Sequence, residues 1–285
     1  MNSSPTRPVV LETIAAVRDA LADVPAVALV PTMGALHDGH LALVDRALEL
    51  ASTVIVSIFV NPLQFGAGED LDKYPRTLED DLDLLGSRGV QFVFAPAADE
   101  LYPTQPIQTT VKAGGVATLF EGRSRPGHFD GVLTVVAKLM NIVQPQFMLF
   151  GQKDAQQVFL VSRMVDDLNL PVRVEIVETV REDDGLARSS RNRFLDDRER
   201  RAAKVLSQAL EAAESSADRG IDSVIAAAQS VLMGEPLVTL DYFAVVDPST
   251  FLPVDDDYRG PAQVLIAARV GETRLIDNER IRLGG

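Results

Sequence analysis

Apolar runs of strand length alternate with apolar stripes of helical spacing along the first 180 residues. The runs, rich in β-branched and aromatic residues as in strands covered on both faces, lie at 26–31, 54–60, 91–95, 147–150 and 172–177. The helical stripes lie at 11–22, 41–51, 77–88, 131–143 and 151–168. This alternation predicts an α/β fold with a Rossmann-like, doubly wound parallel sheet, whose ligands bind at the carboxyl ends of the strands.

Three other segments of this region have weaker patterns. Residues 109–112 form a short β-branched stretch that we interpret as a further strand. Residues 1–8 are polar with two prolines, which predicts a disordered lead. Residues 66–75 are glycine-rich and acidic, which suits a mobile loop.

The pattern changes after residue 180. A segment rich in Arg and Ser is followed by two Ala-rich helical stretches near 196–217 and 221–233. Short strands are expected near 238–246, 264–268 and 274–277. The chain therefore predicts a Rossmann-like domain over 1–180 and a smaller C-terminal α+β lid domain over 181–285.

Composition narrows the possible functions. The 285 residues carry a formal charge of -14, which argues against a nucleic-acid binder because such proteins present basic surfaces. No apolar span has membrane length and no signal-peptide pattern opens the chain, so we expect no membrane partner. The chain has no cysteine, which excludes thiol nucleophiles and thiolate metal sites and fits a cytoplasmic location.

The segment from Pro31 to His40 joins the first of these strands to its helix and holds two of the chain's three histidines. A strand, a glycine-containing turn and a helix start present backbone N–H groups and a positive dipole end to a phosphate. His37 and His40 are three residues apart, so their rings can point the same way, and Gly39 leaves room for a flat base. The same residues also fit a metal site, or a plain turn with Asp38 as the N-cap.

Polar residues follow two further strands of the pattern. Asn61 and Gln64 come after the strand at 54–60, and their amides can orient a hydroxyl or a carboxylate without adding charge. Lys153 and Asp154 stand at a later strand-to-helix junction, where the helix dipole opposes a lysine unless a polyphosphate binds there. The alternatives are a proline-containing turn at Asn61 and a solvated surface lysine.

Two charged segments complete the candidate chemistry. Residues 188–193 are the densest positive stretch, and guanidinium groups bind phosphate oxygens bidentately, although a basic linker is the simpler alternative. Thr77 is the expected N-cap of a helix whose start is acidic. Such acids can help to hold Mg²⁺, but the helix dipole alone also favours them. They are Glu79, Asp80, Asp81 and Asp83.

Five motifs in this chain resemble the pantothenate synthetase family, the pantoate and β-alanine ligases. They are Pro-Thr-Met-Gly-Ala-Leu-His-Asp-Gly-His at 31–40, Phe-Val-Asn-Pro-Leu-Gln-Phe at 59–65, Arg-Pro-Gly-His-Phe at 125–129, Phe-Gly-Gln-Lys-Asp at 150–154 and Ser-Ser-Arg-Asn at 189–192. The His-x-Gly-His signature alone is shared with class I aminoacyl-tRNA synthetases and other nucleotidyltransferases. The five motifs in this order are much more specific.

The resemblance implies an ATP-dependent, AMP-forming ligase. In this family the carboxylate of pantoate attacks the α-phosphate of MgATP, which gives pantoyl adenylate and pyrophosphate. The amine of β-alanine then attacks the mixed anhydride and releases pantothenate and AMP. Such chemistry needs no enzyme nucleophile, in agreement with the missing cysteine. The resemblance also implies ATP and Mg²⁺ as cofactors and a cytoplasmic homodimer.

The same resemblance assigns roles to individual residues. The residues implied in catalysis are His37, His40, Lys153, Ser189 and Arg191. Those implied in ATP binding are Met33, His37, His40, Gly151, Lys153, Asp154, Ser189, Ser190 and Arg191. Those implied in pantoate binding are Met33, Asn61, Gln64 and Gln157. Tyr74, Arg125 and His128 resemble further active-site residues, and Asp81 resembles the acid associated with Mg²⁺.

Two positions depart from the family's pattern. Arg188 stands where the family usually has an uncharged residue, and Gln152 replaces a glutamate that is common in relatives. Two rival interpretations follow from the same residues. One is another adenylate-forming or nucleotidyl-transferring enzyme on the same fold, and the other is a non-catalytic nucleotide sensor.

Overall fold

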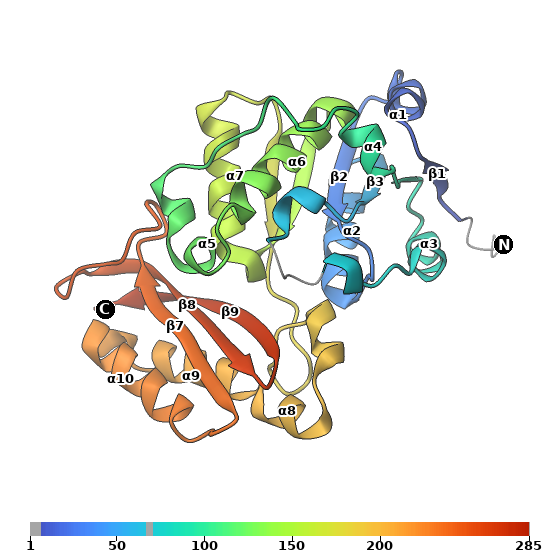
Figure 1. Ribbon diagram of the computed structural model, residues 1–285. Coiled ribbons are helices and arrows are strands. Elements are labelled where there is room, and N and C mark those ends of the chain that lie inside the picture. Colours follow the sequence, from blue (N-terminus) through green and yellow to red (C-terminus); the bar gives the residue numbers. More distant parts are fainter. Residues whose placement is uncertain (1–6, 67–70, 285) are drawn as a thin grey trace. The chain divides into compact units, whose positions relative to one another are not determined.

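The computed structural model describes residues 7–66 and 71–284, which form two compact units (Figure 1). The first unit holds the described residues up to Gly151 together with Gln156–Val177. The second holds Gln152–Ala155 and the chain from Glu178 onward. The chain thus changes unit three residues before position 180, and a four-residue segment that the sequence pattern places in the first domain groups with the second. Residues 1–6 of the expected lead and 67–70 of the expected loop lie outside the described residues.

The first unit is built on a six-stranded parallel sheet, as the alternation of strands and helices predicts. Its order is β1 (Val9–Leu11), β4 (Phe92–Phe94), β3 (Thr53–Ile58), β2 (Val27–Thr32), β5 (Phe147–Gly151) and β6 (Arg173–Val177). From β2 the chain proceeds outward to β3 and β4, whereas β5 returns to the other side of β2 and continues to β6. The switch point between β2 and β5 is where doubly wound sheets bind their ligands.

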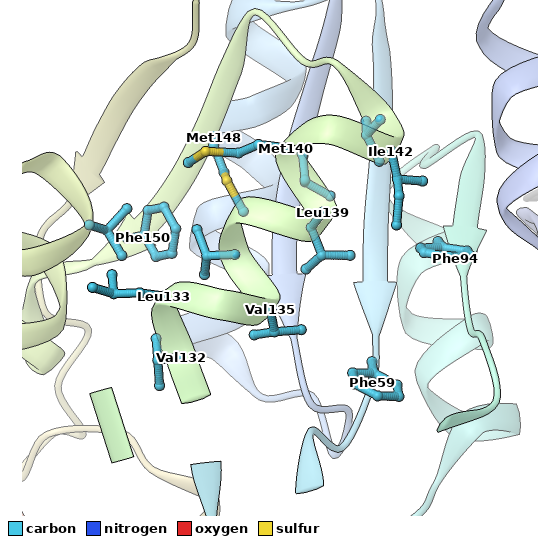
Figure 2. Close-up of a cluster of buried hydrophobic side chains, with 14 of the residues drawn as sticks. Phe59, Phe94, Val132, Leu133, Val135, Leu139, Met140, Ile142, Met148 and Phe150 are labelled. Atoms are coloured by element: carbon cyan, nitrogen blue, oxygen red, sulfur yellow. The ribbon is translucent and has the colours of Figure 1, made fainter. Parts of the chain in front are cut away.

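Helices cover both faces of this sheet. They are α1 (Ile14–Leu21), α2 (Asp38–Leu50), α3 (Leu78–Ser87), α4 (Ala98–Leu101), α5 (Phe120–Ser124), α6 (His128–Val143) and α7 (Ala155–Asp167). Side chains of α1, α6 and α7 share one core with alternate strand residues such as Leu29, and α2 and α3 share another with Val30. Figure 2 shows the apolar side chains of α6, Leu139 and Met140 among them, in the first core.

One strand of this unit was not predicted, and one predicted strand is absent. Strand β1 forms at the sheet edge, between the expected lead at 1–8 and the helical stripe expected from residue 11. Residues 109–112 are not a strand, because side chains of α6 take the place of a neighbouring strand. The N–H of Val111 donates to the hydroxyl of Thr134 (3.0 Å), and the N–H of Ala113 donates to the carboxylate of Asp130 (3.0 Å).

The second unit contains an antiparallel three-stranded sheet of β7 (Val238–Val246), β8 (Gly260–Val270) and β9 (Thr273–Leu283). Its core includes residues of α9 (Val205–Glu214) and α10 (Ile221–Leu232). The helix predicted over 196–217 is instead divided into α8 (Asp197–Ala202) and α9. The division falls at a tight turn, where the N–H of Leu206 donates to the carbonyl of Ala203, three residues back. Among the described helices, none combines the length and apolar character needed to cross a membrane.

Candidate active site

The turn after β2 places both histidines at the start of α2. His37, and not Asp38, is the N-cap: its Nδ1 accepts the N–H of Gly39 at 3.2 Å. In return, Nδ1 of His40 accepts the N–H of His37 at 3.3 Å. The two ring centroids lie 4.0 Å apart, and the ring planes are tilted by 34°. The histidines therefore replace the usual Ser or Asp cap and Glu partner of a capping box.

The capping bonds determine where each imidazole carries its proton. A ring nitrogen that accepts an N–H bond holds no proton, so both neutral rings are protonated at Nε2. Each ring can then donate from Nε2 without carrying a charge. Both donors stand at the N-terminus of a 13-residue helix, where the dipole also favours an anion.

Asp81 holds the turn that leads into this pair. Its carboxylate accepts the N–H of Ala35 (3.0 Å), the N–H of Leu36 (2.8 Å) and the hydroxyl of Thr77 (3.3 Å). Ala35 has a positive φ of 52°, which is strained for a residue with a Cβ, so the turn needs such an anchor. Burial raises the pKa of Asp81, and the N–H groups that it accepts oppose the rise. Thr77 is at the N-cap position of α3 as expected, but its hydroxyl serves Asp81 instead of the helix.

The acidic residues around Asp81 do not fit a magnesium site. Asp81 is 1% exposed and both of its oxygens accept hydrogen bonds from the protein. Glu79 and Asp83 form ion pairs with Arg7 at 2.7 and 2.6 Å. Within residues 7–66 and 71–284, no group of three or more His, Asp or Glu side chains is arranged to hold a metal ion. The prediction that Asp81 assists Mg²⁺ therefore has no support in its geometry.

A hydrogen-bonded cluster centred on Gln64 follows β3. The amide of Gln64 donates to the sulfur of Met33 (3.0 Å) and accepts from the amide of Asn61 (3.1 Å). Asn61 is 1% exposed, and its oxygen accepts the N–H of Leu63 and the hydroxyl of Tyr102. Asn61 thus makes the turn bond that was the alternative to a binding role, and it also orients Gln64.

Arg125 and His128 join this cluster from the start of α6. Nδ1 of His128 lies 2.9 Å from the backbone oxygen of Gln64, and Nε2 lies 3.0 Å from Nη1 of Arg125. Because a carbonyl only accepts, Nδ1 carries the proton and Nε2 accepts from the guanidinium. Arg125 also reaches the oxygen of Gln64 at 3.4 Å. The structure therefore brings together five of the predicted residues, Met33, Asn61, Gln64, Arg125 and His128.

Two residues that the sequence did not single out complete this cluster. The hydroxyl of Tyr102 donates to Asn61 at 2.8 Å, and burial raises the pKa of Tyr102, which keeps it a donor. At Gly131 a Cβ would lie 2.2 Å from the oxygen of Leu63, so only glycine allows α6 to approach the Asn61–Gln64 turn. A glycine in an apolar helical stripe is a signal of such an approach, whereas nothing marks Tyr102 in the sequence.

The remaining predicted residues of the first unit are Tyr74, Gln157 and Gly151. Tyr74 is buried and packs edge-on against Phe65, with ring centroids 6.2 Å apart. Gln157 is half-buried on α7. Gly151 ends β5 at the switch point, where the chain passes into the second unit.

In the second unit, Ser189 to Arg191 form the start of a short 3₁₀ helix, η5 (Ser190–Phe194). The hydroxyl of Ser189 accepts the N–H of Arg191 at 3.2 Å and keeps its own proton to donate. Glu182 supports the segment by accepting from Asn192 (3.0 Å) and Arg200 (2.6 Å). This segment is thus a built loop and not a loose linker.

Arg188, the first departure from the family's pattern, lies beside the same acid. Its Nη1 is 4.0 Å from Oε1 of Glu182. Arg188 thus adds positive charge next to an acid that Arg200 already pairs with. Because Glu182 also holds Asn192, Arg188 contacts the same acid that supports the Ser189 to Arg191 segment.

Lys153 and Asp154 lie in the segment that groups with the second unit, within the 3₁₀ turn η4 (Gln152–Asp154). The Lys153 side chain is 18% exposed, and its Nζ lies 3.7 Å from a carboxylate oxygen of Asp154. Gln152, the other departure, accepts from Arg280 (2.8 Å) and donates to Asn278 (3.3 Å). A glutamate at this position has no N–H group to donate to Asn278, so the amide of Gln152 adds this hydrogen bond.

A doubly wound parallel sheet with paired donors at the start of a switch-point helix defines a nucleotide-binding α/β protein. The family model described as pantoate-beta-alanine ligase matches residues 9–280. The chain belongs to this family of ligases.

Individual relatives agree with this assignment. The chain is 60% identical to the pantothenate synthetase of Leifsonia xyli subsp. xyli over 94% of both chains. It is 48% identical to the crystal structure of pantothenate synthetase from Thermus thermophilus, with a TM-score of 0.89 over 95% of this chain and 98% of that one. A pantoate-beta-alanine ligase from Francisella tularensis, solved with β-γ ATP and β-alanine, is 31% identical, with a TM-score of 0.79 over 95% and 97%.

Proposed function

We propose that this chain condenses pantoate and β-alanine into pantothenate through pantoyl adenylate, with release of AMP and pyrophosphate. Membership of the ligase family supports the overall reaction. The observation that carries the mechanism is the paired capping of His37 and His40, which supplies two neutral Nε2–H donors at the start of α2. An α-phosphate under attack gains charge on its oxygens, and fixed donors stabilise that charge without reorganisation.

The reaction has two steps. A carboxylate oxygen of pantoate attacks the α-phosphorus of ATP, and the bond between that phosphorus and the pyrophosphate oxygen breaks. The neutral amine of β-alanine then attacks the acyl carbon, the bond to the AMP oxygen breaks, and the nitrogen loses one proton. Neither step forms a bond to the enzyme, so rate enhancement comes from alignment and charge stabilisation.

In this proposal, each cluster of site residues has a separate task. His40, Lys153 and Ser189 stabilise the reacting α-phosphate, and Arg191 holds the outgoing pyrophosphate. Asp154 contacts the ribose, and His37 donates to the phosphates. Gln64 binds pantoate with Met33 beside it, and Gln157 completes that pocket. Asn61, with its four internal hydrogen bonds, acts by orienting Gln64.

Magnesium enters this proposal as part of the substrate MgATP. Mg²⁺ keeps several waters and prefers phosphate oxygens with few carboxylates, and Asp81 already uses both of its oxygens within the protein. A homodimer and a cytoplasmic location are also part of the proposal and rest on the resemblance to the family. The charge of -14 supports small-molecule substrates over nucleic acid.

A product assay with the purified protein tests the proposal. Incubation with ATP, pantoate and β-alanine is expected to yield AMP and pantothenate in equal amounts. Release of ADP, or turnover without pantoate, contradicts the proposal. Without β-alanine, acid quenching is expected to recover pantoyl adenylate. A released dinucleotide would favour another nucleotidyl transfer, and ATP binding without turnover would favour a sensor.

A further inference from the structure

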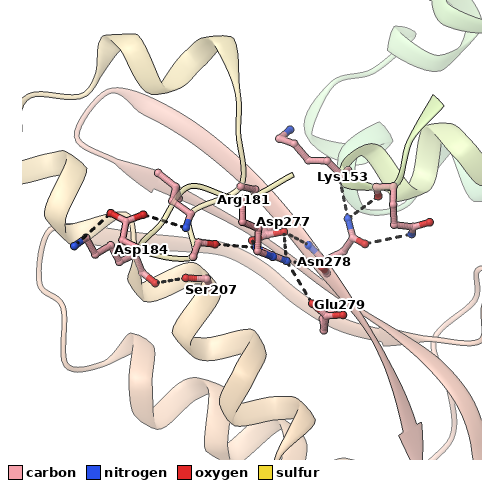
Figure 3. A network of polar contacts seen from close by, with 12 residues as sticks. Lys153, Arg181, Asp184, Ser207, Asp277, Asn278 and Glu279 are labelled. Carbon is pink, nitrogen blue, oxygen red and sulfur yellow. Dashed lines mark hydrogen bonds and ion pairs between the residues drawn. The ribbon is translucent and has the colours of Figure 1, made fainter. Parts of the chain in front are cut away.

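The four residues Gln152–Ala155, called the lysine segment because they contain Lys153, are attached to β9, a strand that is distant from them in the sequence. Gln152–Ala155 are flanked on both sides by the first unit, yet group with the second. The contact that holds them is made by Asn278, in the middle of β9. Its amide nitrogen donates to the carbonyl of Gln152 (3.0 Å) and to the carbonyl of Lys153 (2.8 Å). Figure 3 shows this contact and the Lys153 side chain extending away from it.

Only one orientation of the Asn278 amide is consistent with its hydrogen bonds. Both N–H groups of its amide are used on backbone carbonyls, which can only accept. Its oxygen accepts from Gln263 (2.8 Å) and Gln152 (3.3 Å). Asn278 is 4% exposed, and all four hydrogen-bonding positions of its amide are filled. No other side chain of this size supplies two donors and two acceptor positions, so the site specifies asparagine.

Neighbouring groups keep this amide in place. Arg280 donates to the oxygen of Gln152, so the Gln152 nitrogen must face Asn278. Asp277, next to Asn278, is 3% exposed and paired with Arg181 at 2.6 Å. The backbone of the lysine segment is therefore fixed by a buried, fully satisfied network, and such networks rigidify the groups that they hold.

We propose that Asn278 is a positioning residue for Lys153: it fixes the backbone on either side of the Lys153 α-carbon and thereby directs the ammonium group to the reacting phosphate. It also makes Lys153 part of the unit that carries Ser189 to Arg191. The inference deepens the proposed function and rests on the role of Lys153 in it. In this proposal Asn278 itself does not contact the substrate.

A double-mutant cycle tests the inference by the rate of pyrophosphate exchange into ATP with pantoate. Asn278→Asp keeps the side-chain shape and removes both donors. Because small misplacements of a catalytic group are costly, we expect exchange to fall about 10- to 100-fold. The KM for pantoate is expected to stay within about twofold, since its pocket lies in the first unit. In the Lys153→Ala background, Asn278→Asp is expected to change exchange less than about twofold, because residues that act as a unit are not additive.

Two further variants keep the result interpretable. Asn278→Ala removes the donors without adding a carboxylate beside Asp277, and it replaces Asn278→Asp in the cycle if the latter does not fold. Gln263→Met is the matched control: it loses a bond to the Asn278 oxygen but none to the lysine segment. Exchange in this control is expected to stay within about twofold of wild type.

The outcomes separate the inference from the proposed function. An equal loss in both backgrounds means general structural damage and overturns the inference, as does an Asn278 variant with wild-type exchange. If Lys153→Ala alone leaves exchange unchanged, the proposed role of Lys153 fails, and the inference fails with it. A loss confined to the background that contains Lys153 supports the inference.

Discussion

The two units hold their candidate phosphate donors in opposite ways. In the first unit, the turn that precedes His37 directs the N–H groups of Ala35 and Leu36 inward, and a buried carboxylate, Asp81, accepts them. In the second, the Gln152–Lys153 segment exposes backbone carbonyls, and a buried amide, Asn278, donates to them. The donors differ as well, since the first unit offers two neutral imidazoles and the second offers the cations Lys153 and Arg191.

This difference shows how a buried anchor is matched to the backbone that it holds. A carboxylate can only accept, so it suits a turn at a helix start, where N–H groups lack partners. An amide supplies donors and so suits a segment whose carbonyls face inward. Changing either anchor should therefore disturb one group of donors and leave the other unit intact.

The largest effect is expected from the donors of the first unit. His40→Ala removes an Nε2–H donor from the reacting phosphate, and loss of one such donor typically lowers the rate about 10²- to 10³-fold. Stability should fall by only about 1 kcal/mol, the net value of the lost capping bond. Pre-steady-state adenylation and urea unfolding measure the two effects. His37→Asn separates capping from donation at the neighbouring histidine, since Asn caps helices well but lacks the ring donor. Near-normal adenylation in His40→Ala would remove His40 from the mechanism.

Asp81→Asn disturbs the anchor of the same turn. One oxygen becomes an NH₂ group that faces a backbone N–H, so we expect a loss of about 1–3 kcal/mol in the free energy of unfolding. Because the turn carries both histidines, we expect adenylation to slow roughly 10-fold. Asp80→Asn, on the exposed side of α3, should change stability by less than about 0.5 kcal/mol. A changed Mg²⁺ requirement with unchanged stability would instead favour a metal role for Asp81.

Gly131→Ala tests the pantoate cluster without touching the phosphate donors. The new Cβ meets the oxygen of Leu63 at 2.2 Å and the nitrogen of Gln64 at 2.7 Å, so the Gln64 turn must shift. Overpacking of this kind costs about 1–3 kcal/mol, and we expect the KM for pantoate to rise roughly 10-fold. The KM for ATP should stay close to wild type. Gly115→Ala, where nothing lies within 4 Å of the added Cβ, is the control. An equal rise in both KM values would contradict a local effect.

The smallest effect concerns pH and the ion pair between Asp184 and Arg200, whose charged groups lie 2.9 Å apart. Arg200 above all lowers the pKa of Asp184 from 3.8 to about 2. Because the folded-state pKa is depressed, Asp184 stabilises the fold above its unfolded pKa, and this contribution is lost as the pH falls toward about 2. Wild type should therefore exceed Asp184→Asn in stability at about pH 6, keep only part of that advantage at about pH 3 and lose it below about pH 2. Urea unfolding at both pH values measures it, and a constant difference would contradict the assignment.

Much of the fold follows from local pattern. The five strands read from apolar runs all form; four of them, β2 to β5, lie inside the sheet, where burial of both faces leaves a continuous signal. Strand β1 lies at the sheet edge and directly precedes the helical stripe at 11–22, so its three residues were not separated from that stripe in the sequence pattern. Residues 109–112 look like a strand, but two side chains of a helix, Thr134 and Asp130, accept the N–H groups of Val111 and of the adjacent Ala113. Local propensity cannot reveal a partner that is distant in the sequence.

The sequence predicted only those residues of the candidate site that lie in recognisable motifs. His37, Gln64 and Lys153 stand at strand ends and attract notice by residue type and position. Asn278 carries no such mark, because its task depends on backbone carbonyls more than 120 residues away in the sequence. Asp81 was singled out as one acid of a helix start that could assist a metal, and its role as an anchor of the turn follows only from its burial and its bonds to backbone N–H groups.

The most direct test of the proposed mechanism is pyrophosphate exchange with ATP and pantoate in the absence of β-alanine. Labelled pyrophosphate is expected to enter ATP under these conditions, because adenylation is reversible and precedes the amine. Both His40→Ala and Lys153→Ala are expected to suppress the exchange, since one donor comes from each unit. Exchange that requires β-alanine, or that persists unchanged in either variant, would contradict an adenylation step served by both units.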